Sequence, residues 1–385
     1  MITLIQNADV YAPAPMGLKD ILIAGNKILA VQNKILPPSG FPYIDVFDAA
    51  GLIVTPGFVD GHVHIAGGGG EGGYIMRTPE LPFTAYIKAG ITTIIGLMGT
   101  DGITRTPRNL VARAKAINAL GLTCKILTGC YQMPTPTITG TVESDICLIE
   151  EVIGVGEIAV SDHRSSQPSM RDLKKLAASA RMGGLLSGKA GVLVIHLGDG
   201  EKGLSPIAEI TATTEIPMKH FILTHINRNP GLFEQGLSYA RSGGFIDMTA
   251  GDLKEIHPFG KGLKTALTEK VPVHNITLSS DGGGSLPTFN ERGELESMKV
   301  ADPGSLLGDL VVAVSEYGIP LETALLTVTQ NPARILKLPG KGMVAPQMDA
   351  DLLFLEKKDL SIDHVMAMGN WMIKDRTVLV TDVFE

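Results

Sequence analysis

Four histidines and one aspartate stand at the ends of short apolar runs in this 385-residue chain. His62 and His64 lie two residues apart on one run, and because side chains alternate between faces along a strand, both imidazoles point to the same side. A His-x-His pair also arises by chance, so its position matters more than its spacing. The other three candidates lie at the ends of separate apolar runs: His196, His225 and Asp281. Converging imidazole and carboxylate groups are typical of a divalent metal site, and an imidazole-rich set favours zinc.

The runs that carry these residues belong to a longer series. From Thr55 to about Leu338, short apolar runs alternate with longer helical stretches, which is typical of repeated βα units. The runs are Gly57–Val63, Thr92–Leu97, Lys125–Gly129, Gly156–Val160, Val192–Leu197, Phe221–Thr224, Phe245–Met248 and Ile276–Ser279. Eight units predict a (β/α)₈ barrel, whose catalytic groups lie at the carboxyl ends of the strands. The candidate ligands are therefore expected to converge on one mouth.

The two ends of the chain have a different pattern. Residues 1–54 contain short strands broken by proline and glycine, without a helical period, and predict an antiparallel β unit. Residues 340–385 return to short strands. We therefore expect an α/β protein in which a barrel domain of residues 55–339 stands beside a small β-sandwich domain built from residues 1–54 and 340–385.

The composition of the chain indicates which partners it can bind and in which cellular compartment it acts. The chain has 33 basic and 40 acidic residues, hence a net charge of −7, and no basic stretch, so we expect no nucleic-acid partner. Apolar segments such as Ile91–Met98 are far shorter than the ~18 residues of a transmembrane helix, so no membrane contact is expected. Three cysteines without a CxxC pair, and a start that does not resemble a signal peptide, predict a cytoplasmic protein that acts on a small polar substrate.

At these positions the chain resembles the amidohydrolase superfamily. That superfamily carries HxH on the first barrel strand, a bridging carboxylate on the fourth, histidines on the fifth and sixth, and aspartate on the eighth. The segments Thr55–Asp60 and Gly340–Leu352 also resemble its links between barrel and β-sandwich. The nearer likeness is to the isoaspartyl dipeptidase family, through the motifs Gly67–Glu71, Leu127–Tyr131, Ser161–Arg164, Thr224–Asn229 and Ser279–Ser285.

One position departs from that family's pattern. Where isoaspartyl dipeptidases usually carry a carbamylated lysine that bridges two zinc ions, this chain has Glu157, and no lysine occurs between Ile126 and Leu173. Both groups end in a bidentate oxygen anion, so Glu157 can take the bridging place. A plain charge on the strand is the alternative, but burying it without a cation would be costly. The resemblance implies two ions, one on His62, His64, Asp281 and Glu157, the other on Glu157, His196 and His225.

The resemblance also implies the residues that bind substrate. An isoaspartyl dipeptide has one ammonium and two carboxylates, and Glu71, Arg164 and Arg228 offer the complementary charges. A flexible surface loop is the alternative for Glu71, and surface ion pairs are the alternative for the arginines. Tyr131 would polarise the scissile carbonyl unless it is a buried structural tyrosine. Thr100 and Ser285 are weaker candidates for positioning the substrate.

We therefore predict a metal-dependent dipeptidase that hydrolyses the isopeptide bond of β-aspartyl dipeptides through a metal-bridging hydroxide. The residues expected to take part in catalysis are Asp281, Tyr131 and Glu71, with Asp281 moving the proton to the leaving nitrogen. The resemblance also implies a homo-oligomer. Two alternatives stay open: an amidohydrolase for a cyclic amide or an N-acyl amino acid, and a non-catalytic scaffold, against which the complete ligand set argues.

Overall fold

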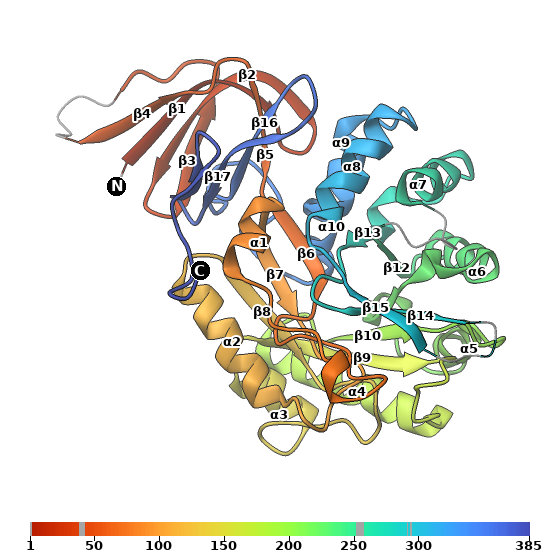
Figure 1. Ribbon diagram of the computed structural model, residues 1–385. Helices are drawn as coiled ribbons and strands as arrows, with labels where there is room; N and C mark the ends of the chain where they lie inside the picture. The colour runs from red at the N-terminus through yellow and green to blue at the C-terminus, as the bar shows by residue number, and fades with distance from the viewer. Residues whose placement is uncertain (1, 38–42, 252–257, 291, 293–294) are drawn as a thin grey trace.

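The protein is described here from a computed structural model that covers residues 2–37, 43–251, 258–290, 292 and 295–385. Within these residues, one sheet of eight parallel strands forms a nearly closed barrel, and a separate sheet gathers both ends of the chain (Figure 1). The predicted (β/α)₈ barrel with a small β unit is therefore confirmed.

The barrel strands follow one another around the sheet in chain order, each parallel to its neighbour. They are β6 (Phe58–Val63), β7 (Ile91–Gly96), β8 (Thr123–Thr128), β9 (Val152–Val160), β10 (Val192–Leu197), β11 (Phe221–Thr224), β12 (Phe245–Thr249) and β13 (Ile276–Ser279). A bridge between Val63 and Gly282 brings the end of β13 back beside β6. All eight lie on the apolar runs of the sequence, because strands buried on both faces read as continuous hydrophobic segments.

A helix follows each of the first seven barrel strands, and three follow the eighth; Figure 1 shows them around the outside of the sheet. The helices are α1 (Phe83–Lys88), α2 (Pro107–Ala119), α3 (Val142–Leu148), α4 (Met170–Ser187), α5 (Ser205–Thr213), α6 (Pro230–Arg241), α7 (Phe259–Thr268), α8 (Ser305–Ser315), α9 (Leu321–Val328) and α10 (Gln330–Ile335). Short 3₁₀ turns occur at η1 (Tyr74–Met76), η2 (Met218–His220), η3 (Ile226–Arg228) and η4 (Val273–Asn275).

Local sequence explains where the longer helices begin. Ser169 and Asp172 form a reciprocal capping box that satisfies free N–H groups at the start of α4. Thr106 caps α2 and Asn229 caps α6, and each is followed by a proline at the first helical position. The α6 cap directly follows Arg228, so the cap fixes the path of the chain just beyond a candidate substrate residue.

The second sheet joins the two ends of the chain. Its strands are β1 (Ile2–Tyr11), β2 (Pro15–Ala24), β3 (Lys27–Gln32), β4 (Ile44–Asp48), β5 (Leu52–Pro56), β16 (Leu352–Glu356), β17 (Ile362–Ala367), β18 (Asn370–Lys374) and β19 (Thr377–Val378). Strand β5 pairs with β16, which links the N-terminal strands to the C-terminal ones. The expected border between residues 54 and 55 falls inside β5, and the division into domains stays a prediction.

Strand β1 corrects one expectation. It is antiparallel to β2 but parallel to β4 and β5, so an all-antiparallel N-terminal unit is wrong. The pairing with β2 shifts register between Ile5 and Ala8, where Asn7 has a positive φ of 58°. Because of this irregularity, the first half of β1 pairs with β4 and the second half with β5.

The sheet that gathers the two ends of the chain has its own buried core. Phe47 on β4 packs edge-on against Phe354 on β16, with ring centroids 5.5 Å apart, and against Trp371 on β18, at 5.1 Å. A cluster of buried residues that includes Ile21 and Met366 forms the rest of this core. The chain end then returns to the barrel, where Asp382 pairs with Arg113 on α2 at 3.3 Å.

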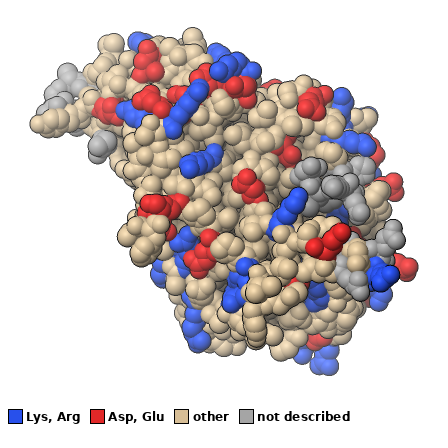
Figure 2. All heavy atoms as spheres, viewed as in Figure 1, with Lys and Arg blue, Asp and Glu red and all other residues tan. Residues whose placement is uncertain are grey.

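An antiparallel hairpin, β14 (Ser285–Phe289) with β15 (Leu295–Val300), follows β13 and lies outside the barrel sheet. The sequence analysis did not anticipate it. On the face shown in Figure 2, basic and acidic residues are interspersed. No helix in the described part of the chain is long and apolar enough to cross a membrane.

Candidate metal and substrate site

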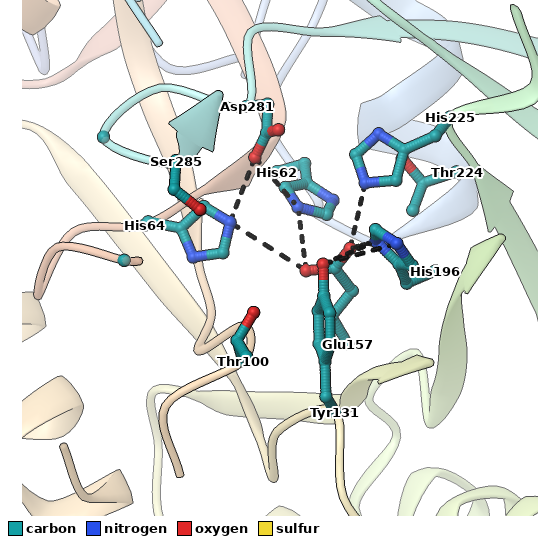
Figure 3. Close-up of polar contacts among 12 residues, drawn as sticks. His62, His64, Thr100, Tyr131, Glu157, His196, Thr224, His225, Asp281 and Ser285 are labelled. Atoms are coloured by element: carbon teal, nitrogen blue, oxygen red, sulfur yellow. Dashed lines mark hydrogen bonds and ion pairs between the residues drawn. The ribbon is translucent and has the colours of Figure 1, made fainter. Parts of the chain in front are cut away.

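Six candidate ligands meet at the carboxyl ends of the barrel strands, around the carboxylate of Glu157 (Figure 3). We call them the inner cluster: His62, His64, Glu157, His196, His225 and Asp281. They come from β6, β9 and β10 and from positions one or two residues after the ends of β6, β11 and β13. The structure therefore brings together every metal ligand that the sequence predicts.

Glu157 stands at the centre of the inner cluster. Its Oε1 lies 2.6 Å from Nδ1 of His196 and 3.0 Å from Nε2 of His225. Its Oε2 lies 3.3 Å from Nε2 of His62 and 3.9 Å from Nε2 of His64. One carboxylate thus reaches four histidines, from β6, β10 and β11, with two different oxygens, an arrangement that suits a bridging ligand.

Asp281 completes the other side of the cluster. Its Oδ1 lies 3.0 Å from Nε2 of His64 and 3.5 Å from Nε2 of His62. Ligand atoms of His62, His64 and Asp281 all lie within 4.8 Å of one another, and so do those of His62, Glu157 and His225. The two groups share His62, and each could hold a metal ion.

Several buried polar atoms of this cluster have no hydrogen-bond partner. They are Nδ1 and Nε2 of His62, Nδ1 of His64, Oε2 of Glu157 and Oδ1 of Asp281. Buried polar atoms nearly always have a hydrogen-bond partner, and a bound ion is one of the recognised explanations for those that do not. The donors are imidazole nitrogens and carboxylate oxygens, the ligands that Zn²⁺ accepts. The residues present therefore fit bound divalent metal.

The pKa shifts in the inner cluster also indicate a site for cations. Burial disfavours a charged ring at His62, but the Glu157 carboxylate outweighs it and raises the pKa of His62 to about 9. Burial also opposes ionisation of Asp281, yet its hydrogen bond and charge interaction with His64 lower its pKa to about 2. Two buried carboxylates are thus held ionised by positive charge, and bound cations can supply that charge in place of protons.

Backbone geometry is unusual at two of these positions. His225 has a φ of 62° and Asp281 a φ of 54°, a left-handed conformation that L-residues rarely adopt. Gly284 shows how closely the chain packs there, since a Cβ at this position would lie 2.6 Å from Oδ1 of Asp281 and 2.9 Å from Cδ2 of His64. Such strain at ligand positions is typical of functional sites.

A second set of polar residues surrounds the inner cluster, and we call it the outer ring: Glu71, Thr100, Tyr131, Arg164, Arg228 and Ser285. Glu71 accepts a hydrogen bond from Thr100 at 2.7 Å and pairs with Arg164 at 3.0 Å. Ser285, at the start of the hairpin, donates to the other Glu71 oxygen at 3.4 Å. Burial opposes ionisation of Glu71, but Thr100 and Arg164 outweigh it and lower its pKa.

Tyr131 connects the two sets. Its hydroxyl lies 2.7 Å from Nδ1 of His196, and Figure 3 shows it beside the Glu157 carboxylate. Burial and the Glu157 charge raise the pKa of Tyr131 well above its usual range. The phenol therefore stays protonated near neutral pH and can donate a hydrogen bond.

The two arginines of the outer ring differ in their partners. Arg164 is held by Glu71 and by Asp162, which accepts hydrogen bonds from its Nε at 3.0 Å and its Nη2 at 2.9 Å. Arg228 is half-buried on η3, and its guanidinium has no hydrogen-bond partner among the described residues. Its charge acts on Tyr131 and His225, so it lies near the cluster. Arg228 is thus the arginine whose charge is available to a ligand.

Asp162 and Thr249 also contact the inner cluster, and the sequence analysis did not identify either of them as a site residue. Asp162 lies 2.9 Å from Nε2 of His196, and Thr249 lies 2.7 Å from Nδ1 of His225. Each contacts the imidazole nitrogen that does not face Glu157. Sequence offers only a weak signal for such partners: a polar residue just after, or at the end of, a strand next to one that carries a histidine.

Comparison with known proteins decides the family. The structure matches the crystal structure of a beta-aspartyl dipeptidase from Fervidobacterium islandicum AW-1 with a TM-score of 0.93 and 41% sequence identity, over 98% of both chains. The chain belongs to the beta-aspartyl dipeptidase family. The family resemblance inferred from the sequence motifs is therefore confirmed.

The chain has other similarities, which are more distant or cover a shorter part of it. Residues 258–372 match the amidohydrolase family. A dihydroorotase from Elusimicrobium minutum is 41% identical over 109 residues, which is 28% of this chain and 24% of that protein. The chain thus spans about a quarter of the length of the curated relatives it matches. A dihydropyrimidinase from Brevibacillus agri NCHU1002 shares the fold, with a TM-score of 0.66 and 14% identity over 99% of this chain and 96% of that one.

Proposed function

We propose that the chain hydrolyses the isopeptide bond of β-aspartyl dipeptides with two divalent metal ions, zinc by the chemistry of the ligands. The observation that carries this proposal is the close match, along nearly the whole chain, to a beta-aspartyl dipeptidase crystallised with a beta-Asp-Leu dipeptide. The arrangement of charges supports it, because a site for metal ions lies beside one anionic and two cationic side chains.

The inner cluster would hold the metal ions. His62, His64, Asp281 and Glu157 would bind one ion, and Glu157, His196 and His225 the other. Two bound divalent ions would supply an activated water and a polarised amide carbonyl. Glu157 would serve as the bridge without carbamylation.

Asp281 and Tyr131 would carry out the proton and charge steps. Asp281 is ionised at neutral pH and lies beside the inner cluster, so it would accept a proton from the attacking water and pass it to the leaving nitrogen. The protonated Tyr131 hydroxyl would donate a hydrogen bond to the carbonyl oxygen as negative charge develops there. Both side chains reach the cluster from the carboxyl ends of their strands.

The outer ring would bind the charged ends of the dipeptide. Glu71 would pair with the α-ammonium, assisted by Thr100 and Ser285, which already orient its two oxygens. Arg228, whose guanidinium has no hydrogen-bond partner in the described part of the chain, would bind one carboxylate. Arg164 would contact the other carboxylate through the Nη1 edge that now faces Glu71, because Asp162 occupies its other edge.

The test is a hydrolysis assay of the purified protein, loaded with zinc, on β-aspartyl-leucine beside α-aspartyl-leucine, an N-acyl amino acid and dihydroorotate. We expect cleavage of β-aspartyl-leucine with a kcat/KM well above that of the other three. A preference for the cyclic amide or the N-acyl amino acid would replace this proposal with the alternative amidohydrolase activity. A cytoplasmic location and a homo-oligomeric assembly stay predictions from the sequence, which fractionation and light scattering can test.

A further inference from the structure

We propose that Asp162 is a positioning residue that couples the metal site to the substrate site, because its single carboxylate holds both the ring of His196 and the guanidinium of Arg164. The part of this proposal that concerns substrate binding through Arg164 rests on the proposed function. The part that concerns metal binding through His196 depends only on the inner cluster.

The contacts of Asp162 divide between the two sites. Oδ2 lies 2.9 Å from Nε2 of His196 and accepts from Nη2 of Arg164 at 2.9 Å. Oδ1 accepts from Nε of Arg164 at 3.0 Å and from the Arg164 backbone N–H at 2.7 Å. Nη2 also lies 3.3 Å from Nε2 of His196, because both groups converge on Oδ2. The side chain is only 3% exposed, so water does not compete for these bonds.

The contact with His196 determines which ring nitrogen faces the metal site. An ionised carboxylate can only accept, so it keeps the proton of a neutral imidazole on Nε2. The lone pair of Nδ1 then points to the inner cluster, where Nδ1 lies 2.6 Å from Glu157. A carboxylate behind a ligand histidine fixes the tautomer and increases the basicity of the ligand nitrogen.

The corresponding contact of His225 is with a neutral group instead of a carboxylate. Its Nδ1 meets the hydroxyl of Thr249 at 2.7 Å, and a hydroxyl can either donate or accept. The hydroxyl carries no charge, and Thr249 touches no substrate residue of the outer ring in the described contacts. Of Asp162 and Thr249, only Asp162 therefore connects a candidate metal ligand to the outer ring.

The contact with Arg164 determines which edge of the guanidinium remains free. Asp162 takes Nε and Nη2 with both of its oxygens, a bidentate pairing that fixes the plane of the guanidinium. Nη1 is left pointing at Glu71, 3.0 Å away. A change at Asp162 should therefore alter metal affinity and substrate binding together.

The first experiment measures metal affinity without any substrate. Metal-free wild-type protein, Asp162→Asn and Asp162→Glu are titrated with Zn²⁺ in competition with a chromophoric chelator. We expect Asp162→Asn to bind one of its two ions roughly 10- to 100-fold more weakly, the usual cost of losing a ligand's outer partner. The other ion should bind as in the wild type, and Asp162→Glu, which keeps the charge, should recover part of the loss.

The matched control is Asp145→Asn. Asp145 is equally buried and also accepts several hydrogen bonds, from Thr128, Ile138 and Thr139, but none from the inner cluster or the outer ring. It should leave the affinity for both ions unchanged. If Asp145→Asn weakens zinc binding as much as Asp162→Asn, or if Asp162→Asn binds both ions within twofold of wild type, the proposal is wrong.

The second experiment measures KM for β-aspartyl-leucine at saturating zinc. Asp162→Asn should raise KM roughly 2- to 100-fold, the range for residues coupled in one network. Arg164→Met should raise KM without changing zinc affinity, and adding Asp162→Asn to it should raise KM no further. An additive double variant, or an unchanged KM in Asp162→Asn, would overturn the coupling. A wild-type protein that does not cleave β-aspartyl-leucine would instead refute the proposed function, and the zinc titration would then decide the role of Asp162.

Discussion

The inner cluster and the outer ring differ in how their polar groups are satisfied. Four residues of the inner cluster have buried polar atoms without a hydrogen-bond partner. Its two carboxylates, Glu157 and Asp281, both lie close to the same imidazole nitrogen of His62. In the outer ring, Glu71 and Arg164 are already paired with each other and with their neighbours. A cation would satisfy the unpartnered atoms of the inner cluster, whereas a ligand that binds Glu71 or Arg164 would displace contacts that these residues already make.

The location of the two sets explains this difference. The inner residues lie on barrel strands or directly after them, where the sheet holds them at fixed spacing. The outer residues lie mostly on the loops that follow the strands, and most are half-buried. A rigid scaffold can hold like charges close together for an ion, and more exposed loops can adapt to a ligand.

The largest effect should come from changing the centre of the inner cluster. Glu157→Gln removes the anion that faces all four histidines, and we expect the protein to lose most of its metal. Activity should fall at least about 10³-fold, since metal catalysis supplies several kcal/mol. Elemental analysis alongside the β-aspartyl-leucine assay measures both. A variant that retains two ions would remove Glu157 from the metal site.

Metal removal tests the inner cluster as a whole. Chelation should lower the free energy of unfolding by about 4 kcal/mol for each ion, relative to protein in Zn²⁺ at a thousand times its Kd, because the ions bind only the folded state. Thermal unfolding with and without Zn²⁺ measures this difference. Reconstitution should need no bicarbonate, since Glu157 requires no carbamylation, and a strong bicarbonate dependence would point to a lysine at the site.

Changing the outer ring should separate binding from metal content. Arg228→Met should lower kcat/KM for β-aspartyl-leucine by about 2–5 kcal/mol in transition-state energy while two ions stay bound, because one substrate carboxylate loses its partner. Glu71→Gln should have a similar effect, although it also removes the charge that faces Arg164. Metal analysis of both variants is the control. Parallel loss of metal and activity would mean that these residues maintain the fold instead.

The smallest effects should come from the hydroxyls that orient Glu71. Thr100→Val and Ser285→Ala each remove one hydrogen bond to its carboxylate, at 2.7 and 3.4 Å. We expect about 1 kcal/mol or less in kcat/KM for each, with the longer Ser285 contact contributing less. Steady-state kinetics of the two variants checks the order. A Ser285 effect larger than that of Thr100 would indicate a direct contact with substrate.

The sequence by itself determined the barrel and the positions of its candidate metal ligands. Parallel strands buried on both faces are continuous apolar runs, so their ends could be located and the polar residues there identified. The same local pattern supplied His62, His64, His196, His225 and Asp281. Glu157 and the outer ring needed the family resemblance as well, because one carboxylate on a strand does not reveal its partners.

Only the tertiary structure decided which groups meet. Glu157 lies 68 residues from His225, and Asp162 lies 34 residues from His196, so no local pattern links them. The same holds for the parallel pairing of β1 with β4 and β5, which depends on an irregularity at Asn7. Hydrophobic periodicity reports which face of an element is buried, but partners across the fold are chosen by packing, hydrogen bonding and charge, which act between residues far apart in the chain.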